Sequence, residues 1–334
     1  MKILVTGGGG YVGSVLVRKL IEADYDVTVL DTMVYGKNPL RNIRSEIDLC
    51  IGDIRNKQLL KTILKNTDIV IHLASISNDP SSELNHKLTT DVNYEATIDL
   101  VNLSKQSNVK RFIFASTSSV YGIKKTENVT EDLSLEPLTI YSKTKAWAEE
   151  YILENNNDDF TTTSIRSATV CGYSPRMRLD TVVNILTAHA INNNKIIVYG
   201  GSQKRPNIHI DDISDLYMQM ITADKDKIAG QAFNVGFENH TVNKLAEMIR
   251  NIISKDIEIE IQPTDDLRSY HISSDKIQKT LGFKPKKTIS DAVYDIKEAF
   301  KTGKIPDWTS SKYYNVKKLK ELEIKWNTLL NLLD

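Results

Sequence analysis

Cysteine is scarce in this sequence, and its rarity excludes two classes of protein. The 334 residues include two cysteines, Cys50 and Cys171, which are too few for a framework of disulfide bonds. Neither lies in a Cys-X-X-Cys pair, so we expect both thiols to be reduced and structural. The six histidines are scattered and none has the spacing of a zinc-binding motif, which predicts a protein that holds no metal.

Long apolar runs and an excess of one charge are also missing. No stretch approaches the about 20 apolar residues that cross a membrane, and the chain reaches Gly7 before the core of a signal peptide could form. Basic and acidic residues number 43 each, so the net charge is zero. This balance gives no electrostatic reason to expect nucleic acid or an anionic membrane as a partner. We therefore expect a cytoplasmic protein.

The order of apolar and amphipathic segments favours an α/β fold. Hydrophobic residues make up 40% of the chain and charged residues 26%, as in ordinary globular proteins. Short apolar runs alternate with amphipathic stretches such as residues 12–22 and 141–154, which is typical of βαβ units in a parallel sheet. The runs are apolar throughout, as a doubly wound sheet covered on both faces requires. The predicted strands are residues 2–6, 26–31, 47–51, 68–73, 111–116 and 161–166.

The regular alternation ends after about residue 171, which predicts a second, smaller domain of mixed α/β structure. Residues 231–236 again have the composition of a buried strand, so we expect the chain to return to the main sheet there. The predicted division is a first domain of residues 1–170 plus about 207–236, and a second of about 171–206 plus 237–303. Residues 304–334 form an extension with a helix at 316–333.

A glycine-rich turn follows the first predicted strand and opens the first predicted helix. Gly7, Gly10 and Gly13 lie where backbone N–H groups and a helix N-terminus can hold a pyrophosphate, although such a turn can also be only a tight connection. Asp31 ends the second strand at about the distance in sequence where an acid binds the ribose hydroxyls of a dinucleotide. A carboxylate there repels a 2′-phosphate, which favours NAD over NADP.

A tyrosine and a lysine one helical turn apart form the candidate catalytic pair. Tyr141 and Lys145 lie on one face of a predicted helix. A phenol with a pKa of about 10 is a poor base at neutral pH, and an adjacent ammonium lowers that pKa. Thr117 follows a predicted strand at the edge where doubly wound folds bind ligands, and its hydroxyl can hold the substrate oxygen. Taken alone, Tyr141 and Lys145 could also be ordinary surface residues of a helix. Their combination with the glycine turn and Asp31 favours a catalytic role.

Five motifs together resemble the extended short-chain dehydrogenase/reductase family, in its branch of NAD-dependent nucleotide-sugar epimerases and dehydratases. They are TGGGGYVG at residues 6–13, GDIR at 52–55, HLAS at 72–75, STSSVYG at 116–122 and YSKTK at 141–145. The resemblance covers about residues 1–300 and implies a Rossmann-type sheet that binds NAD. The cofactor contacts that it implies are Gly7, Gly10, Tyr11, Val12, Gly13, Asp31, Asp53, Ile54, Leu73, Ala74, Ser75, Asn93, Ser116, Tyr141 and Lys145.

The resemblance also implies a mechanism, in which Tyr141, with Thr117 and Lys145, removes a proton from a sugar hydroxyl while hydride passes from that carbon to NAD. Dehydratases of the family carry an Asp-Glu pair directly after the catalytic threonine; Ser118 and Ser119 stand there, which argues against dehydration. We therefore predict an epimerase that acts through a transient 4-keto nucleotide sugar. The alternatives are a nucleotide-sugar 4-dehydrogenase and, with less support, a 4,6-dehydratase or a non-catalytic NAD-binding protein.

Several departures from the family's pattern leave the sugar and the nucleotide base open. Thr169 replaces an asparagine that contacts substrate, Ser77 replaces a lysine, and Arg205 resembles the arginine that clamps the nucleotide diphosphate. Surface salt bridges are the alternative for the arginines. The predicted substrate contacts are Ser77, Thr117, Ser118, Thr169, Arg176, Arg178, Arg205 and Arg268. Family members commonly form homodimers through a four-helix bundle, which here implies residues 93–106 and 145–153.

Overall fold

A seven-stranded sheet, parallel throughout, forms the centre of the molecule. The computed structural model describes residues 1–323 apart from residues 125, 127 and 265–270. The strand order is β10-β6-β5-β4-β1-β2-β3, and every pair is parallel. This confirms the predicted doubly wound sheet, including the return of the chain to its edge. The strands are β1 (Lys2–Thr6), β2 (Asp26–Asp31), β3 (Asp48–Ile51), β4 (Ile69–His72), β5 (Arg111–Thr117), β6 (Thr161–Ser167) and β10 (Gln231–Val235).

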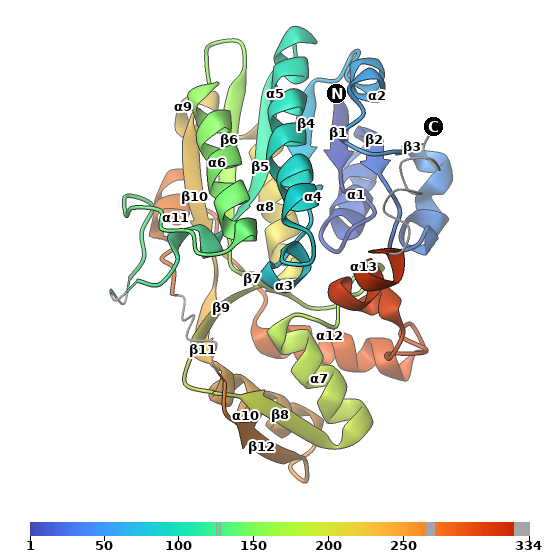
Figure 1. The fold of residues 1–334 in the computed structure, drawn as a ribbon, viewed down its shortest axis with the longest axis vertical. Coiled ribbons are helices and arrows are strands. Elements are labelled where there is room, and N and C mark those ends of the chain that lie inside the picture. Colours follow the sequence, from blue (N-terminus) through green and yellow to red (C-terminus); the bar gives the residue numbers. More distant parts are fainter. Residues whose placement is uncertain (125, 127, 265–270, 324–334) are drawn as a thin grey trace.

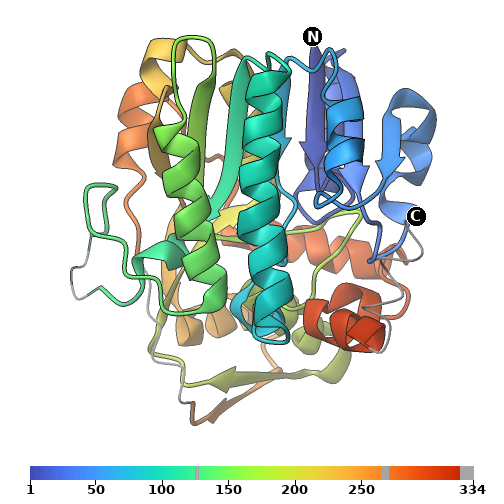
Figure 2. The same ribbon diagram turned by 45° about the horizontal axis from the view of Figure 1, so that its top comes forward.

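Helices cover both faces of this sheet, which explains why strands such as β1 and β4 are apolar on both sides. Ile3 and Val5 pack into a core layer with α1 (Gly13–Glu22) and α8 (Ile210–Thr222). Leu4, between them, points into the opposite layer with α5 (Ala96–Gln106) and α6 (Ile140–Glu154), which lie side by side in Figures 1 and 2. The remaining helices around the sheet are α2 (Lys57–Ile63), α3 (Asp79–Ser82), α4 (His86–Thr90), α9 (Lys225–Ile228) and α11 (Asp275–Leu281).

A smaller layer lies beyond the carboxyl ends of the large sheet, at the lower end of Figure 1. Its core packs α7 (Val182–Asn193), α10 (Val242–Ile253) and α12 (Ile289–Lys301) against the two-stranded sheet of β8 (Lys195–Tyr199) and β12 (Glu258–Gln262). A three-stranded sheet of β7 (Thr169–Cys171), β9 (Lys204–His209) and β11 (Glu238–Thr241) joins this layer to the large sheet. The division into two domains with the predicted boundaries stays a prediction.

The chain after α12 runs back toward the large sheet. Tyr313 O accepts a hydrogen bond from Leu179 N at 2.8 Å, and α13 (Asn315–Glu323) follows. Buried Tyr314 and Leu319 hold this segment in place. The predicted helix at 316–333 is present up to residue 323, and its remainder lies outside the described residues. Over the described part of the chain, no helix is both long enough and apolar enough to cross a membrane.

Candidate active site

A cavity of about 490 Å³ lies at the carboxyl ends of the large sheet. Its lining comes from the segments that follow β1, β2, β3, β4, β5 and β6, and from α6, α8, the small layer and α13. Most of the residues singled out from the sequence meet here. They are Gly7, Gly10, Tyr11, Val12, Gly13, Asp31, Asp53, Ile54, Leu73, Ala74, Ser75, Ser77, Ser116, Thr117, Ser118, Tyr141, Lys145, Thr169, Arg176, Arg178 and Arg205.

The glycine turn gives the cavity a floor made of backbone. Gly7 has a φ of +74°, and a Cβ there would lie 2.7 Å from Ala74 N. A Cβ at Gly13, the first residue of α1, would lie 2.3 Å from Gly7 O. Side chains at these positions would push the turn apart, so glycine keeps the start of α1 open to a ligand. The turn therefore fits a dinucleotide whose diphosphate approaches the helix N-terminus.

The carboxylate of Asp31 lines the cavity beside this turn. Its two oxygens accept hydrogen bonds from Gly9 N at 2.9 Å and Met33 N at 2.7 Å. Burial raises the pKa of Asp31, and these two bonds oppose the rise. Because each carboxylate oxygen can accept more than one hydrogen bond, both stay able to bind ribose hydroxyls. Asp53 forms a further part of the wall, held by an ion pair with Arg55 at 2.7 Å.

The candidate catalytic pair, Tyr141 and Lys145, lies in the first two turns of α6. Thr139 and Ser142 form a capping box that fixes the start of this helix, so Tyr141 and Lys145 point into the cavity from a rigid position. Lys145 Nζ donates to Ala115 O on β5 at 2.9 Å. Lys145 is almost fully buried, and desolvation lowers its pKa to about 7.

The expected lowering of the tyrosine pKa is not what the structure shows. Burial, helped by the charge of Asp79, raises the pKa of Tyr141 to about 12. Arg178 and a hydrogen bond with Thr117 oppose the rise. The physical reason is that desolvation of the phenolate outweighs the nearby charges. The side chains alone therefore keep Tyr141 protonated at neutral pH.

Asn93, a predicted cofactor contact, does not line the cavity. Asn93 accepts from Ile76 N at 2.8 Å and donates to Ile76 O at 3.0 Å, so it holds the loop after β4 from behind rather than facing a ligand. Its position on a helix packed behind the loop is the reason, and the motif gave no sign of it. Arg268 lies outside the described residues.

The cavity lining also contains residues that were not singled out from the sequence, among them Tyr35, Asp79, Asp180 and Asn315. Asp180 pairs with Arg178, with 2.8 Å between Arg178 Nε and Asp180 Oδ1. Asn315 belongs to the extension of residues 304–334, in which no sequence motif indicates a function. The spacing of Asp180 two residues after Arg178 was the one local signal that could have been used.

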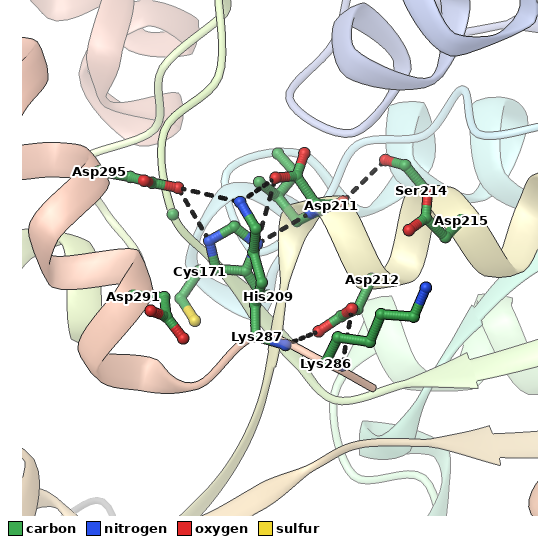
Figure 3. A network of polar contacts seen from close by, with 12 residues as sticks. Cys171, His209, Asp211, Asp212, Ser214, Asp215, Lys286, Lys287, Asp291 and Asp295 are labelled. Carbon is green, nitrogen blue, oxygen red and sulfur yellow. Dashed lines mark hydrogen bonds and ion pairs between the residues drawn. The ribbon is translucent and has the colours of Figure 1, made fainter. Parts of the chain in front are cut away.

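A second polar cluster lies outside the cavity, between α8 and α12 (Figure 3). His209, Asp211 and Asp295 are close enough together to suggest a metal site. However, Lys287 Nζ lies 2.6 Å from Asp211 and 3.8 Å from Asp295, and His209 Nδ1 accepts from Asp211 N at 3.1 Å. The ammonium of Lys287 therefore takes the place that a cation would have, and the cluster is an ion-pair network that joins the two helices.

Comparison with known proteins agrees with this site. The sequence pattern of the NAD dependent epimerase/dehydratase family matches residues 3–236. A putative UDP-glucose 4-epimerase from Methanocaldococcus jannaschii is 30% identical over 313 residues, which cover 92% of this chain and 97% of that protein. A dTDP-D-glucose 4,6-dehydratase from Mus musculus is 28% identical over 307 residues, covering 85% of this chain and 84% of that protein.

Comparison with solved structures shows a similar fold. The structure of UDP-glucose 4-epimerase with UDP-glucose from Thermotoga maritima matches with a TM-score of 0.83 at 26% identity, covering 90% of this chain and 99% of that chain. The family pattern spans well over half of the sequence and includes the glycine turn, Thr117, Tyr141 and Lys145. The chain therefore belongs to the NAD-dependent epimerase/dehydratase family, and NAD is its cofactor.

Proposed function

We propose that the protein is a nucleotide-sugar epimerase that acts through a transient 4-keto sugar. The observation that carries this proposal is the meeting of Thr117, Tyr141 and Lys145 in one cavity with the glycine turn and Asp31. The similarity to proteins named UDP-glucose 4-epimerase supports the same reaction class. The volume of the cavity lies within the range of about 300–1,000 Å³ typical of ligand pockets.

In this proposal, Tyr141 takes the proton of the sugar hydroxyl and returns it later. Thr117 forms a hydrogen bond with the phenol of Tyr141 and lines the cavity, so its hydroxyl can also bind the oxygen of the sugar hydroxyl. The ammonium form of Lys145, fixed on Ala115 O, favours negative charge on its neighbour. When bound, NAD supplies the hydride acceptor and a positively charged ring that favours the phenolate.

The residues after Thr117 favour return of the hydride over elimination of water. Ser118 lines the cavity, and Ser119 Oγ lies 3.0 Å from Thr117 Oγ1. Neither hydroxyl can act as the carboxylic acid that dehydration needs. Of the nearby cavity carboxylates, Asp79 accepts from Thr139 Oγ1 at 2.6 Å and Asp180 is paired with Arg178, so both are held in other contacts.

The test is proton NMR of the purified protein with a panel of UDP-, GDP-, dTDP- and CDP-sugars, while the near-ultraviolet absorbance of NADH is followed. We expect a new sugar isomer at C4 and no lasting NADH absorbance. A keto sugar with lasting absorbance would show a 4-dehydrogenase instead, and a 4-keto-6-deoxy sugar would show a dehydratase. Tyr141→Phe serves as the control, because it should bind NAD but form none of these products.

We further propose a homodimer that pairs α5 and α6 with their copies in a second subunit. Trp147 on α6 is 42% exposed, and its ring meets that of Tyr94 edge-on at 5.8 Å, which leaves an aromatic surface on the outer face of these helices. Light scattering should give twice the mass of the chain, and Trp147→Glu should give a monomer. Tyr199→Glu, which changes an exposed aromatic residue on β8, should stay a dimer. A monomeric unmodified protein would contradict this proposal.

A further inference from the structure

Arg176 is a buried cation at the edge of the cavity. It lies in the segment between β7 and α7 and is 4% exposed. Its guanidinium stacks on the ring of Tyr35, with 3.8 Å from Cζ to the ring centre, and its Nη2 donates to Asn315 Oδ1 at 2.5 Å. Asn315 Nδ2 in turn donates to Ser77 Oγ at 3.1 Å. Arg176 is thus held between Tyr35 and the pair of Asn315 and Ser77.

The topology of the sheet places this cation over the glycine turn. Tyr35 follows β2 and Ser77 follows β4, and β1 lies between these two strands. A guanidinium that bridges the ends of β2 and β4 therefore crosses the end of β1, from which the turn begins. A main-chain contact also places Arg176 beside the glycine turn, because Arg176 N donates to Ser14 Oγ, in the first turn of α1, at 3.4 Å.

The guanidinium keeps a donor free for a ligand. Within the described part of the chain, Arg176 Nε is buried and has no hydrogen-bond acceptor, and Arg176 forms no ion pair. Its neighbour Arg178, in contrast, is paired with Asp180. Burial lowers the pKa of Arg176 to about 10, which reflects the cost of a desolvated cation. An anion that enters the cavity at this point would offset that cost.

We propose that Arg176, positioned by Asn315 of the C-terminal segment, binds the diphosphate of NAD. The diphosphate of a dinucleotide lies at a helix N-terminus beside the glycine turn. A guanidinium can donate to two phosphate oxygens at once. Arg176 was predicted from the sequence as a substrate contact, and this proposal assigns it to the cofactor instead. Asn315 is a positioning residue, and the C-terminal segment forms one wall of the cofactor site.

Calorimetric titration of the cofactor-free protein tests this proposal without any sugar turnover, so the outcome does not depend on the proposed reaction. The ligands are NAD, ADP-ribose, adenosine and UDP. With Arg176→Gln, we expect the dissociation constants of NAD and ADP-ribose to rise about 10- to 100-fold, as for loss of charge-assisted hydrogen bonds. Those of adenosine, which has no diphosphate, and of UDP should change less than about twofold. Lys320→Gln, which removes an exposed charge from α13, is the control and should bind all four ligands normally.

Changes at Asn315 separate positioning from a general loss of structure. Asn315→Ala should weaken NAD binding about 3- to 10-fold, because Arg176 loses one of its two anchors. Asn315→Asp should weaken it more, since the new carboxylate would pair with Arg176 and compete with the diphosphate. Arg176→Lys, which keeps the charge, should lose less than Arg176→Gln, and circular dichroism checks that each variant is folded.

In the unmodified protein, added salt should weaken NAD binding and leave adenosine binding unchanged. This measurement stands even if the Arg176 variants do not fold. Unchanged NAD affinity in folded Arg176→Gln would overturn the proposal. A larger loss for UDP than for NAD would also overturn it, and would assign Arg176 to the diphosphate of the nucleotide sugar.

Discussion

Glu149 on α6 and Arg166 on β6 form a buried ion pair, and its removal should strongly destabilise the protein. Glu149 is 1% exposed and lies one turn after Lys145; Arg166 on β6 is 6% exposed. Glu149 Oε1 accepts from Arg166 Nε at 2.9 Å and Nη2 at 2.6 Å, and Glu149 Oε2 accepts from Ser164 Oγ at 2.6 Å. In Glu149→Leu, the guanidinium stays buried with its charge uncompensated. We expect the free energy of unfolding to fall by about 3–5 kcal/mol.

The assay is urea unfolding at neutral pH, with all variants at the same saturating NAD concentration because bound cofactor adds to stability. The double variant Glu149→Leu/Arg166→Met replaces both charges by apolar side chains and should lose less than Glu149→Leu alone. Glu150→Gln, at the next and exposed position of α6, should stay within about 0.5 kcal/mol of the unmodified protein. A single variant that loses less than about 1 kcal/mol, or a double variant that loses as much as the single one, would refute this reasoning.

Three further predictions concern the proposed catalytic groups. Asp79 raises the pKa of Tyr141, so Asp79→Asn should lower it. The rise of activity with pH that reports ionisation of Tyr141 should then occur at lower pH, and a shift to higher pH would contradict this. Thr117 lowers the same pKa, so Thr117→Val should shift this rise of activity to higher pH while turnover falls. An unchanged pH dependence would count against the hydrogen bond between Thr117 and Tyr141. Burial lowers the pKa of Lys145 to about 7, below its usual value of about 10.4. Between about pH 7 and 10, Lys145 is therefore protonated in the unfolded chain and mostly neutral in the folded protein. The free energy of unfolding of the cofactor-free protein should then rise with pH, by up to about 1.4 kcal/mol per pH unit. In Lys145→Met this rise should be smaller, and equal slopes in urea titrations of the two proteins would contradict the assignment.

The large sheet could be predicted from the sequence because its strands carry a local signal. Buried on both faces, most of them are apolar runs such as residues 2–6, and each predicted strand lies within one or two residues of the observed one. The small sheets were harder, because β7 has only three residues and β11 reads as a polar segment, Glu238–Thr241. Their pairing depends on contacts between distant parts of the chain, as between β11 and β9.

The candidate site likewise contains residues that local motifs predict and residues whose role depends on contacts between distant parts of the chain. Gly7, Asp31 and Tyr141 lie in motifs that place them at strand ends or on a helix face, so their meeting could be expected. Asn315 could not be found, because its role comes from contact with Ser77, which is 238 residues away in the sequence. The pKa of Tyr141 was also beyond sequence reasoning, since it depends on how deeply the phenol is buried.

The position of β10 has a consequence for how the protein is made. The chain leaves the large sheet after β6 and returns only at Gln231, to lay β10 along the exposed edge of β6. Phe233 and Val235 of β10 belong to the same core layer as Ile165 of β6. On the ribosome, this edge stays uncovered while β7, α7, β8 and β9 are synthesised. Synthesis from the N-terminus therefore cannot finish one folded unit before the next begins. Until β10 is made, the unpaired backbone N–H and C=O groups along this edge of β6 can pair with another chain.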